Sequence, residues 1–301
     1  MVNEELRGVV VPVITPVDSE DRVDEGAFRK VLRRLVGAKV HAIFVGGSAG
    51  EGPLLVPTEW ERMVRIAFEE ANGKTVLMGG VSDTSTKRVT DKVRILKSIG
   101  YKRFVITPTY YINTKLPDEH LRVFGEARAA GGDMEMVVYN IPQCVGSVIA
   151  VETLVEVAKR GWAKYCKESS GNLEYFKRVV NEAGPAGLKV LMGDEPLIPD
   201  GLWSGAKGIV PVCANYDPGL FIKCFEAATS GNREETLRLH KIIMHKRQVL
   251  LLGGACWLSG IKYALSRMGM GIGKPVSPLQ PVMGKQQQEI DDLVKSDQGS
   301  I

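Results

Sequence analysis

A lysine marks the end of one apolar run in the sequence. The segment Ala163-Lys-Tyr-Cys-Lys-Glu-Ser-Ser-Gly-Asn172 is a short extended run that ends at Lys167 and continues as a polar turn. Lysine is among the residues that proteins bury least often. Burial disfavours the charged form, lowers the pKa and makes the amine a usable nucleophile near neutral pH. A strand-end lysine that extends into solvent is the commoner alternative. Residues elsewhere in the chain are needed to choose between a buried and an exposed Lys167.

Four other polar or glycine-rich groups follow short apolar runs. They are Gly46-Gly-Ser-Ala-Gly-Glu51, Thr107-Pro-Thr-Tyr-Tyr111, Tyr139-Asn-Ile-Pro142 and Gly193-Asp-Glu195. In the first group, glycines flank Ser48-Ala49 and would expose successive backbone N–H groups, which suit a small anion such as a carboxylate; a plain tight turn is the alternative. A tyrosine beside a desolvated lysine is suited to proton transfer, so Tyr139 is a candidate for that function, with an ordinary core tyrosine as the alternative.

Eight short apolar runs alternate with helical patterns along the chain. The runs are Val9–Thr15, Ala42–Gly46, Val76–Gly79, Phe104–Thr107, Met136–Tyr139, Lys164–Lys167, Val190–Met192 and Gly208–Val212. Most are continuous rather than alternating, as expected for parallel strands that are buried on both faces. Between them, apolar residues recur at helical spacing in Asp24–Ala38, Thr58–Asn72, Thr84–Ile99, Pro117–Ala130, Val151–Arg160 and Leu173–Ala183. Such units predict an α/β fold, a (β/α)8 TIM barrel, with the chemistry at the carboxyl ends of the strands.

An open, doubly wound α/β sheet is the alternative architecture. It would need a glycine-rich turn after the first strand, but that turn reads Pro-Val-Asp-Ser-Glu-Asp, and no G-x-G-x-x-G occurs in the sequence. Gly273-Lys274 is followed by Pro275, so the pattern of a phosphate-binding P-loop is absent as well. We therefore expect no nucleotide or dinucleotide cofactor.

The last part of the chain exceeds what a barrel requires. We assign residues 1–230 to the barrel and residues 231–301 to a helical C-terminal extension. The helix that would close the barrel and the helices of the extension are predicted at Pro218–Thr229, Glu234–Leu251, Gly260–Met268 and Pro281–Ser296. The sequence leaves open whether the extension is decoration or a subunit interface.

Composition argues against several classes of function. The 301 residues carry a net charge of +4 from 39 basic and 35 acidic residues, which is too mild and too evenly mixed for a nucleic-acid partner. The five cysteines contain no C-x-x-C pair, so neither a zinc site nor a disulfide framework is expected. The four histidines lie away from the predicted strand ends, which argues against a metal cluster. A charged N-terminus and the lack of a long apolar stretch predict a cytoplasmic protein with no membrane partner.

Taken in order, the polar groups resemble the dihydrodipicolinate synthase/N-acetylneuraminate lyase family. The opening Gly8-Val-Val-Val-Pro-Val-Ile-Thr-Pro16 and the segment Gly205-Ala-Lys-Gly208 are similar too, and the resemblance runs to about Val282. It implies a class I, metal-free aldolase that forms a lysine Schiff base with pyruvate or a related 2-oxo acid, in a homotetramer built as a dimer of dimers. Lys167 would be the Schiff-base lysine and Tyr139 the tyrosine that relays protons.

The resemblance implies roles for further residues. Ser48 would be the hydroxyl residue of the carboxylate-binding turn, and Tyr111 the tyrosine that one subunit lends to another, although an extra residue in that segment lets Tyr110 and Tyr111 exchange roles. Val210 would line the pyruvyl pocket. The other positions that it places around the substrate are Gly47, Ala49, Tyr110, Cys144, Gly193 and Glu195.

Two departures from the family pattern bear on the substrate. Ala49 stands where the family usually has a second hydroxyl residue, so only its backbone can serve there. Cys144 stands where synthases of the diaminopimelate route carry an arginine for the carboxylate of aspartate semialdehyde, and a second carboxylate then lacks its best partner. The lyases of the family match better. Asp194 or Glu195 would bind hydroxyls of a sugar-acid-like substrate, with solvated loop carboxylates as the alternative.

The sequence therefore predicts a Schiff-base lyase or aldolase that cleaves or forms a carbon–carbon bond between pyruvate and an aldehyde. Its small-molecule partners would be a sugar-acid-like 2-oxo acid and that aldehyde. Three alternatives stay open: a 4-hydroxy-tetrahydrodipicolinate synthase, a 2-keto-3-deoxy sugar-acid dehydratase, and a non-catalytic protein that binds a 2-oxo acid.

Overall fold

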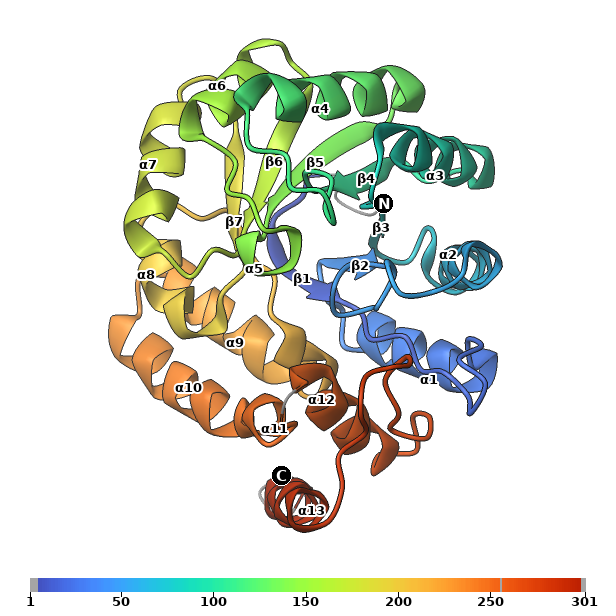
Figure 1. Ribbon diagram of the computed structural model, residues 1–301. Coiled ribbons are helices and arrows are strands. Elements are labelled where there is room, and N and C mark those ends of the chain that lie inside the picture. The colour runs from blue at the N-terminus through green and yellow to red at the C-terminus, as the bar shows by residue number, and fades with distance from the viewer. Residues whose placement is uncertain (1–4, 255, 299–301) are drawn as a thin grey trace.

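The computed structural model describes residues 5–254 and 256–298, and its centre is a closed barrel of parallel strands (Figure 1). The strands are β1 (Gly8–Pro12), β2 (Ala42–Val45), β3 (Val76–Gly80), β4 (Arg103–Ile106), β5 (Glu135–Asn140), β6 (Ala163–Glu168), β7 (Lys189–Met192) and β8 (Gly208–Ile209). Each strand pairs in parallel with the next one along the chain, and β8 pairs with β1 to close the barrel. The predicted (β/α)8 TIM barrel is confirmed.

Helices connect the strands and surround the barrel (Figure 1). Those that follow the strands are α1 (Glu25–Gly37), α2 (Pro57–Ala71), α3 (Thr86–Ile99), α4 (Pro117–Gly131), α5 (Pro142–Val145), α6 (Val151–Lys159), α7 (Leu173–Ala183), α8 (Ile198–Trp203) and α9 (Pro218–Thr229). Two short 3-10 helices, η1 (Glu195–Leu197) and η2 (Val212–Asn215), lie next to α8 and α9. The chain ends in α10 (Arg233–Lys246), α11 (Gln248–Leu251), α12 (Trp257–Ser266) and α13 (Lys285–Gln298).

Helix α1 shows how local sequence sets these elements. The Asp24 side chain accepts a hydrogen bond from the backbone N–H of Ala27 at 2.9 Å and so caps the first turn. From there, Phe28, Val31 and Leu32 recur at three- and four-residue spacing and are buried against the barrel. The polar face of the same helix stays outside. The pattern that predicted the helix is therefore the one that packs it.

Two apolar layers hold the barrel. The larger layer lies between the strands and the helices and contains Val9, Val11, Ile43, Ile106 and Val138 among its buried residues. The second layer fills the barrel interior and contains Val10, Phe44, Met78, Val105, Val137, Tyr139, Tyr165, Leu191 and Val210. Successive residues of a strand point to opposite faces, so neighbours such as Val10 and Val11 belong to different layers. The continuous apolar runs of the sequence follow from this double burial.

Three strands are shorter than predicted, and β2 loses only its last predicted residue, Gly46. The first strand spans Gly8–Pro12 instead of Val9–Thr15, and the last spans Gly208–Ile209 instead of Gly208–Val212. Proline has no N–H to donate to a strand ladder. Pro211 accordingly precedes the 3-10 helix η2 and does not extend β8.

The predicted helices of the C-terminal part also shift. The single helix expected at Glu234–Leu251 is divided at Arg247 into α10 and α11, where the N–H of Leu250 bonds to the carbonyl of Arg247 at 2.9 Å in a tighter turn. Helices α12 and α13 lie three to four residues away from the predicted boundaries at one or both ends. Helix α8 was not predicted, because Pro199 and Gly201 lie within it and both disfavour helices.

The helices that follow α9 pack on one side of the barrel, near α1 and α9 in Figure 1. Helix α10 packs against α9, and α12 packs against both α11 and α13. The division into a barrel of residues 1–230 and an extension of residues 231–301 stays a prediction, and "the extension" denotes that second part below.

None of the helices in the described ranges combines the length and the apolar character that a bilayer crossing requires. The five cysteines all lie within those ranges, and each is a free thiol.

Candidate active site

Lys167 lies inside the carboxyl end of the barrel, on β6. Its residue is 6 % exposed, and its Nζ sits 4.0 Å from the centroid of the Tyr139 ring and 5.3 Å from that of Phe44. Burial lowers the pKa of Lys167 to about 7, against smaller opposing effects from Asp194 and Cys144. A substantial fraction of this amine is therefore neutral at pH 7, which is the form that attacks a carbonyl. The structure contradicts a solvent-extended lysine.

Tyr139 is the strand neighbour of Lys167, because β5 and β6 pair with Tyr139 opposite Lys167. The tyrosine is 3 % exposed, and burial raises the pKa of its hydroxyl well above the usual range, while the hydroxyls of Ser169 and Ser48 act in the opposite direction. Its ring packs edge-on against Phe44 at a centroid distance of 6.1 Å. Tyr139 is thus held as a neutral hydroxyl next to the amine, ready to donate a proton.

The turn that follows β2 faces the same interior. Two backbone bonds close it: the N–H of Glu51 donates to the Ser48 carbonyl, and that of Gly52 to the Gly47 carbonyl, both at 3.2 Å. Within the described ranges, the N–H groups of Ser48 and Ala49 donate to no other residue of the chain. Free, adjacent amides of this kind suit a carboxylate. Ala49 itself is buried, and because its side chain is a methyl group, only its backbone can bind a ligand here.

Two glycines of the predicted site are required by close packing. A Cβ atom at Gly47 would lie 2.6 Å from the Phe44 ring, and one at Gly193 would lie 1.8 Å from Oγ of Ser169. Neither position can carry a side chain unless the neighbour moves. Both glycines therefore let the site residues beside them approach one another.

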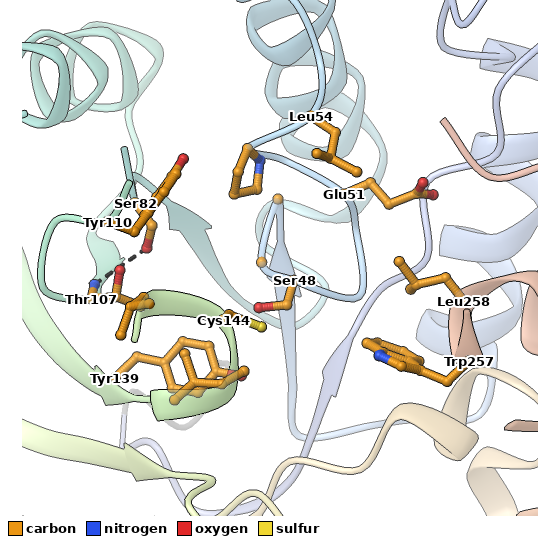
Figure 2. Close-up of a pocket in the computed structure, with 15 residues that line it drawn as sticks. Ser48, Glu51, Leu54, Ser82, Thr107, Tyr110, Tyr139, Cys144, Trp257 and Leu258 are labelled. Carbon is orange, nitrogen blue, oxygen red and sulfur yellow. Dashed lines mark hydrogen bonds between the residues drawn. The ribbon is translucent and has the colours of Figure 1, made fainter. Parts of the chain in front are cut away.

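Two adjoining cavities meet at these side chains, and they share Ser48, Tyr139, Ile141, Cys144 and Trp257 in their walls. The first, which we call the lysine lobe, has a volume of about 270 Å³ and includes Lys167, Asp194 and Val210. The second, the Tyr110 lobe, has a volume of about 300 Å³ and includes Thr107 and Tyr110. Figure 2 shows Ser48, Tyr139 and Cys144 gathered between Tyr110 on one side and Trp257 on the other.

The two tyrosines after β4 have different surroundings. Tyr110 lines the Tyr110 lobe, and burial raises the pKa of its hydroxyl to about 12. Tyr111 is 87 % exposed and has a left-handed backbone, with φ of 77°. The side chain of Tyr111 is therefore not packed within its own chain. The structure brings Tyr110 to the cavity of its own chain, and the predicted cross-subunit role of Tyr111 stays a prediction.

The acidic pair after β7 is split between two roles. Glu195 is buried, and its Oε1 accepts a 2.7 Å hydrogen bond from the N–H of Cys213, while its Oε2 lies 3.2 Å from Nε of Arg247. Burial raises its pKa. Asp194 is partly exposed in the lysine lobe and accepts from the N–H of Gly171 at 2.9 Å. The solvated alternative is wrong for Glu195, whose carboxylate is engaged inside the protein and leaves Asp194 as the carboxylate open to a ligand.

The remaining predicted residues reach the cavity from different elements. Val210 follows β8 and is buried in the floor of the lysine lobe. Cys144 lies on the short helix α5 and lines both lobes. Among the described residues, no group of three or more His, Cys, Asp or Glu side chains has the arrangement of a metal site.

A model of the dihydrodipicolinate synthetase family matches residues 5–297 of the chain. The chain belongs to this family. An uncharacterized DapA-like lyase of Halobacterium salinarum is 32% identical over 91% of this chain and 88% of that protein. A 4-hydroxy-tetrahydrodipicolinate synthase of Methanothermobacter thermautotrophicus is 28% identical over 89% of this chain and 94% of that protein.

Solved structures agree in fold. The dihydrodipicolinate synthase from Aquifex aeolicus superposes with a TM-score of 0.91 at 23% identity, covering 97% of this chain and 98% of that one. The CdNal protein of Clostridium difficile, solved in complex with mannosamine, gives a TM-score of 0.90 at 17% identity over 97% of this chain and 99% of that one. Membership of the dihydrodipicolinate synthetase family makes the chain a class I lyase of the pyruvate-dependent aldolase kind.

Three residues around the site of this family member were missed by sequence reasoning. Arg247 and Trp257 line the lysine lobe from the extension, and no local pattern marks either of them. Glu168 is fully buried one residue after Lys167, where its Oε1 accepts from Nδ2 of Asn140 at 3.1 Å and from the N–H of Ser170 at 2.7 Å. The sequence signal for Glu168 is a carboxylate at the end of an apolar strand. Its bond to Asn140 links the end of β6 to the end of β5.

Proposed function

We propose that this protein cleaves a hydroxylated 2-oxo acid into pyruvate and an aldehyde, or joins the two, through a Schiff base at Lys167. The observation that carries the proposal is a buried amine, with a pKa of about 7, beside a buried neutral tyrosine and a turn with free amides. Those three features supply a nucleophile, a proton carrier and a carboxylate site in one cavity.

The first half of the reaction forms the Schiff base. Neutral Nζ of Lys167 attacks the keto carbon, while the amides of Ser48 and Ala49 hold the adjacent carboxylate. Tyr139 donates its proton to the carbinolamine hydroxyl, which leaves as water and gives a protonated iminium. The tyrosinate that remains is stabilised by the new positive charge beside it.

The second half breaks the carbon–carbon bond. The tyrosinate of Tyr139 takes the proton of the C4 hydroxyl, the C3–C4 electron pair moves into the iminium, and an aldehyde and an enamine result. Tyr139 then protonates the enamine at C3, water adds to the iminium that results, and the proton released by that water returns to Tyr139 as pyruvate leaves and the Lys167 amine is restored. Each proton that Tyr139 gives in the first half is recovered in the second.

The walls of the lysine lobe support a hydroxylated substrate. Asp194 offers acceptor oxygens and Arg247 offers donor nitrogens at the same opening. Such a mixture of donors and acceptors fits the alternating hydroxyls of a sugar acid. Cys144, at the position where an arginine would hold a second carboxylate, offers only a thiol, which is a weak donor and a weak acceptor.

One observation favours a second candidate, the condensation of pyruvate with aspartate semialdehyde. Arg247 brings a guanidinium into the lysine lobe from the extension. This group could bind a second carboxylate. Several relatives carry the name 4-hydroxy-tetrahydrodipicolinate synthase. The Nε edge of Arg247 already faces Glu195 at 3.2 Å, which leaves only its outer edge for a ligand.

The decisive experiment combines trapping with product analysis. Borohydride reduction in the presence of pyruvate should add one pyruvyl mass to Lys167, and an unmodified Lys167 would refute the Schiff base. A panel of 2-keto-3-deoxy sugar acids should then release pyruvate. Loss of water without cleavage would identify a dehydratase, turnover of aspartate semialdehyde a synthase, and trapping without any turnover a binding protein. Lys167→Ala serves as the control in each assay.

We also propose that copies of this chain assemble through the loop after β4. Tyr111, Ile112 and Leu116 of that loop are 87%, 78% and 61% exposed, an unusual cost for large apolar side chains. A tetramer, as expected for the family, would cover them. Light scattering on the purified protein should give four times the mass of one chain, and a monomer at micromolar concentration would exclude this assembly.

A further inference from the structure

Glu51 closes the turn whose amides are free. It has a left-handed backbone, with φ of 55°, which is strained for a residue that has a side chain. Figure 2 shows its side chain extending away from Ser48 and Tyr139. The residue is 1 % exposed, so its carboxylate needs partners inside the protein.

Both partners of that carboxylate come from the extension. Oε1 accepts from Nζ of Lys262 on α12, a residue that is itself 3 % exposed. Oε2 accepts from the backbone N–H of Val276 at 2.6 Å. More than 200 residues separate Glu51 from either partner along the chain. We call this set of three residues the Glu51 clasp.

A second ion pair fixes the same part of the extension to the barrel. Nζ of Lys274 lies 2.6 Å from Oδ1 of Asp21, and the N–H of Ser277 lies 3.3 Å from both oxygens of that carboxylate. Residues 274–277 are thereby held over the loops that follow β1 and β2. The Glu51 clasp is therefore backed by a fixed segment.

The clasp acts on the amides through short links. The N–H of Glu51 donates to the carbonyl of Ser48, and a Cβ atom added at Gly52 would lie 2.1 Å from the carbonyl oxygen of Gly46. The turn has no spare room, so a shift of Glu51 would move the Ser48 and Ala49 amides with it. Hydrogen bonds to a carboxylate weaken steeply when the donor angle changes.

We propose that Glu51 is a positioning residue, and that Lys262 and the amide of Val276 hold the carboxylate-binding turn in its working geometry through it. This inference rests on the proposed function, because it takes the Ser48–Ala49 amides as the carboxylate site. The extension would then support the active site of its own chain. This role differs from both alternatives that the sequence left open, decoration and a subunit interface.

The test compares two ketones that differ in one group. Pyruvate has a carboxylate and hydroxyacetone has none, and both are trapped on Lys167 by borohydride. In Glu51→Gln and Lys262→Met, the half-saturating concentration of pyruvate should rise by about 10-fold or more. Trapping of hydroxyacetone should stay within about twofold of wild type, because it does not use the turn. Lys262→Arg keeps the positive charge and should recover most of the loss.

A matched control is available elsewhere in the extension. Lys246 lies on α10 and pairs with Asp217 at 2.8 Å and with Asp297 at 3.8 Å, with its side chain 14% exposed, and it has no contact with Glu51 among the described ion pairs. Lys246→Met removes an ion pair between extension and barrel in the same way, and its pyruvate saturation should match wild type.

The outcomes separate the hypotheses. If wild-type Lys167 traps neither ketone, the proposed function is wrong. That failure does not depend on the Glu51 clasp, which is intact in the wild-type protein. If pyruvate saturation is unchanged in folded Glu51→Gln and Lys262→Met, or if both ketones are affected equally, the positioning role is wrong. Should these variants not fold, Glu51→Asp keeps the charge but shortens the reach; a normal pyruvate saturation in that variant would overturn the proposal.

Discussion

Two lysines are buried among the residues that the structure describes, and their environments have opposite effects on their charge. Lys167 is 6 % exposed and Lys262 is 3 % exposed, and desolvation lowers the pKa of both. Nζ of Lys262 donates to the carboxylate of Glu51, which favours its charged form. Nζ of Lys167 lies over the Tyr139 and Phe44 rings, and Asp194 acts on it only from a distance. Burial makes each lysine costly, and the partner decides whether it remains a cation or becomes a reactive amine.

The largest expected effect separates the two lysines by chemistry. Lys167→Met removes the amine that we propose forms the Schiff base, so turnover should fall by more than about 10,000-fold. Lys262→Met keeps that amine and should retain saturable trapping of hydroxyacetone. Steady-state assays together with intact-mass measurement would show this. Residual turnover of Lys167→Met near the wild-type rate would place the nucleophile elsewhere.

Tyr139 distinguishes the surroundings of Lys167 from those of Lys262. Tyr139→Phe keeps the ring under Nζ of Lys167 but removes the proton carrier, so turnover should fall by about 100- to 10,000-fold. Binding of the 2-oxo acid should be retained, because the amides of the turn are untouched. Single-turnover kinetics would separate the two steps. An equal loss in binding and chemistry would point to a disturbed cavity instead.

Stability should respond to the two lysines with opposite sign. Lys262→Met leaves the Glu51 carboxylate buried without its cation, and the free energy of unfolding should drop by about 3–5 kcal/mol. Lys167 has a folded pKa of about 7, well below the unfolded value of a lysine. The unfolded chain then binds more protons between pH 7 and about 10.5, so wild-type stability rises with pH across this window. Lys167→Met removes that cost and should gain on the order of 1–3 kcal/mol at pH 7.

Urea unfolding of both variants at pH 7 and pH 10 would measure these changes. The gain from Lys167→Met should shrink at the higher pH, where the lysine is neutral in the folded state and about a quarter neutral in the unfolded state. Destabilisation by both substitutions alike would mean that Lys167 has an unrecognised partner.

The smallest effect concerns the distant carboxylate. The pKa of Lys167 near 7 implies a trapping rate that rises with pH through neutrality, as the neutral amine forms. Asp194 favours the charged form of Lys167, so Asp194→Asn should move this rise to lower pH by a fraction of a unit. Rates at saturating pyruvate across pH 5 to 9 would detect it. An unchanged pH dependence would show that Asp194 is protonated in the working enzyme, and a shift to higher pH would contradict the prediction.

Much of this arrangement was predictable from sequence, for a physical reason. Parallel strands buried on both faces leave continuous apolar runs, and the polar groups at their ends lie next to them in the chain. Lys167, Tyr139 and Ser48 were found in that way, and the structure places all three around one cavity. The same logic applied to the helix around Lys262 would have marked a lysine within Leu-Ser-Gly-Ile-Lys-Tyr-Ala, but a helical lysine is usually assumed to reach solvent.

Other parts could not be predicted, because tertiary packing creates them. Arg247 and Trp257 enter the lysine lobe from the extension, and only the path of the folded chain brings them there. The division of labour between Asp194 and Glu195 depends on Cys213 and Arg247, which are distant in sequence. The backbone turns at Tyr111, where φ is 77°, and this turn decides which of Tyr110 and Tyr111 faces the cavity. The extra residue in the loop sequence does not predict that turn.

The Glu51 clasp also has a consequence for the growing chain on the ribosome. Synthesis proceeds from the N-terminus, and domains tend to fold as they emerge. A nascent chain that ends before Lys262 already contains every strand of the barrel, together with Lys167 and Tyr139, but it lacks both partners of the Glu51 carboxylate. In such a chain the carboxylate of Glu51 lacks both partners and has to remain hydrated. The Glu51 clasp can form only after Lys262 and Val276 have been synthesised.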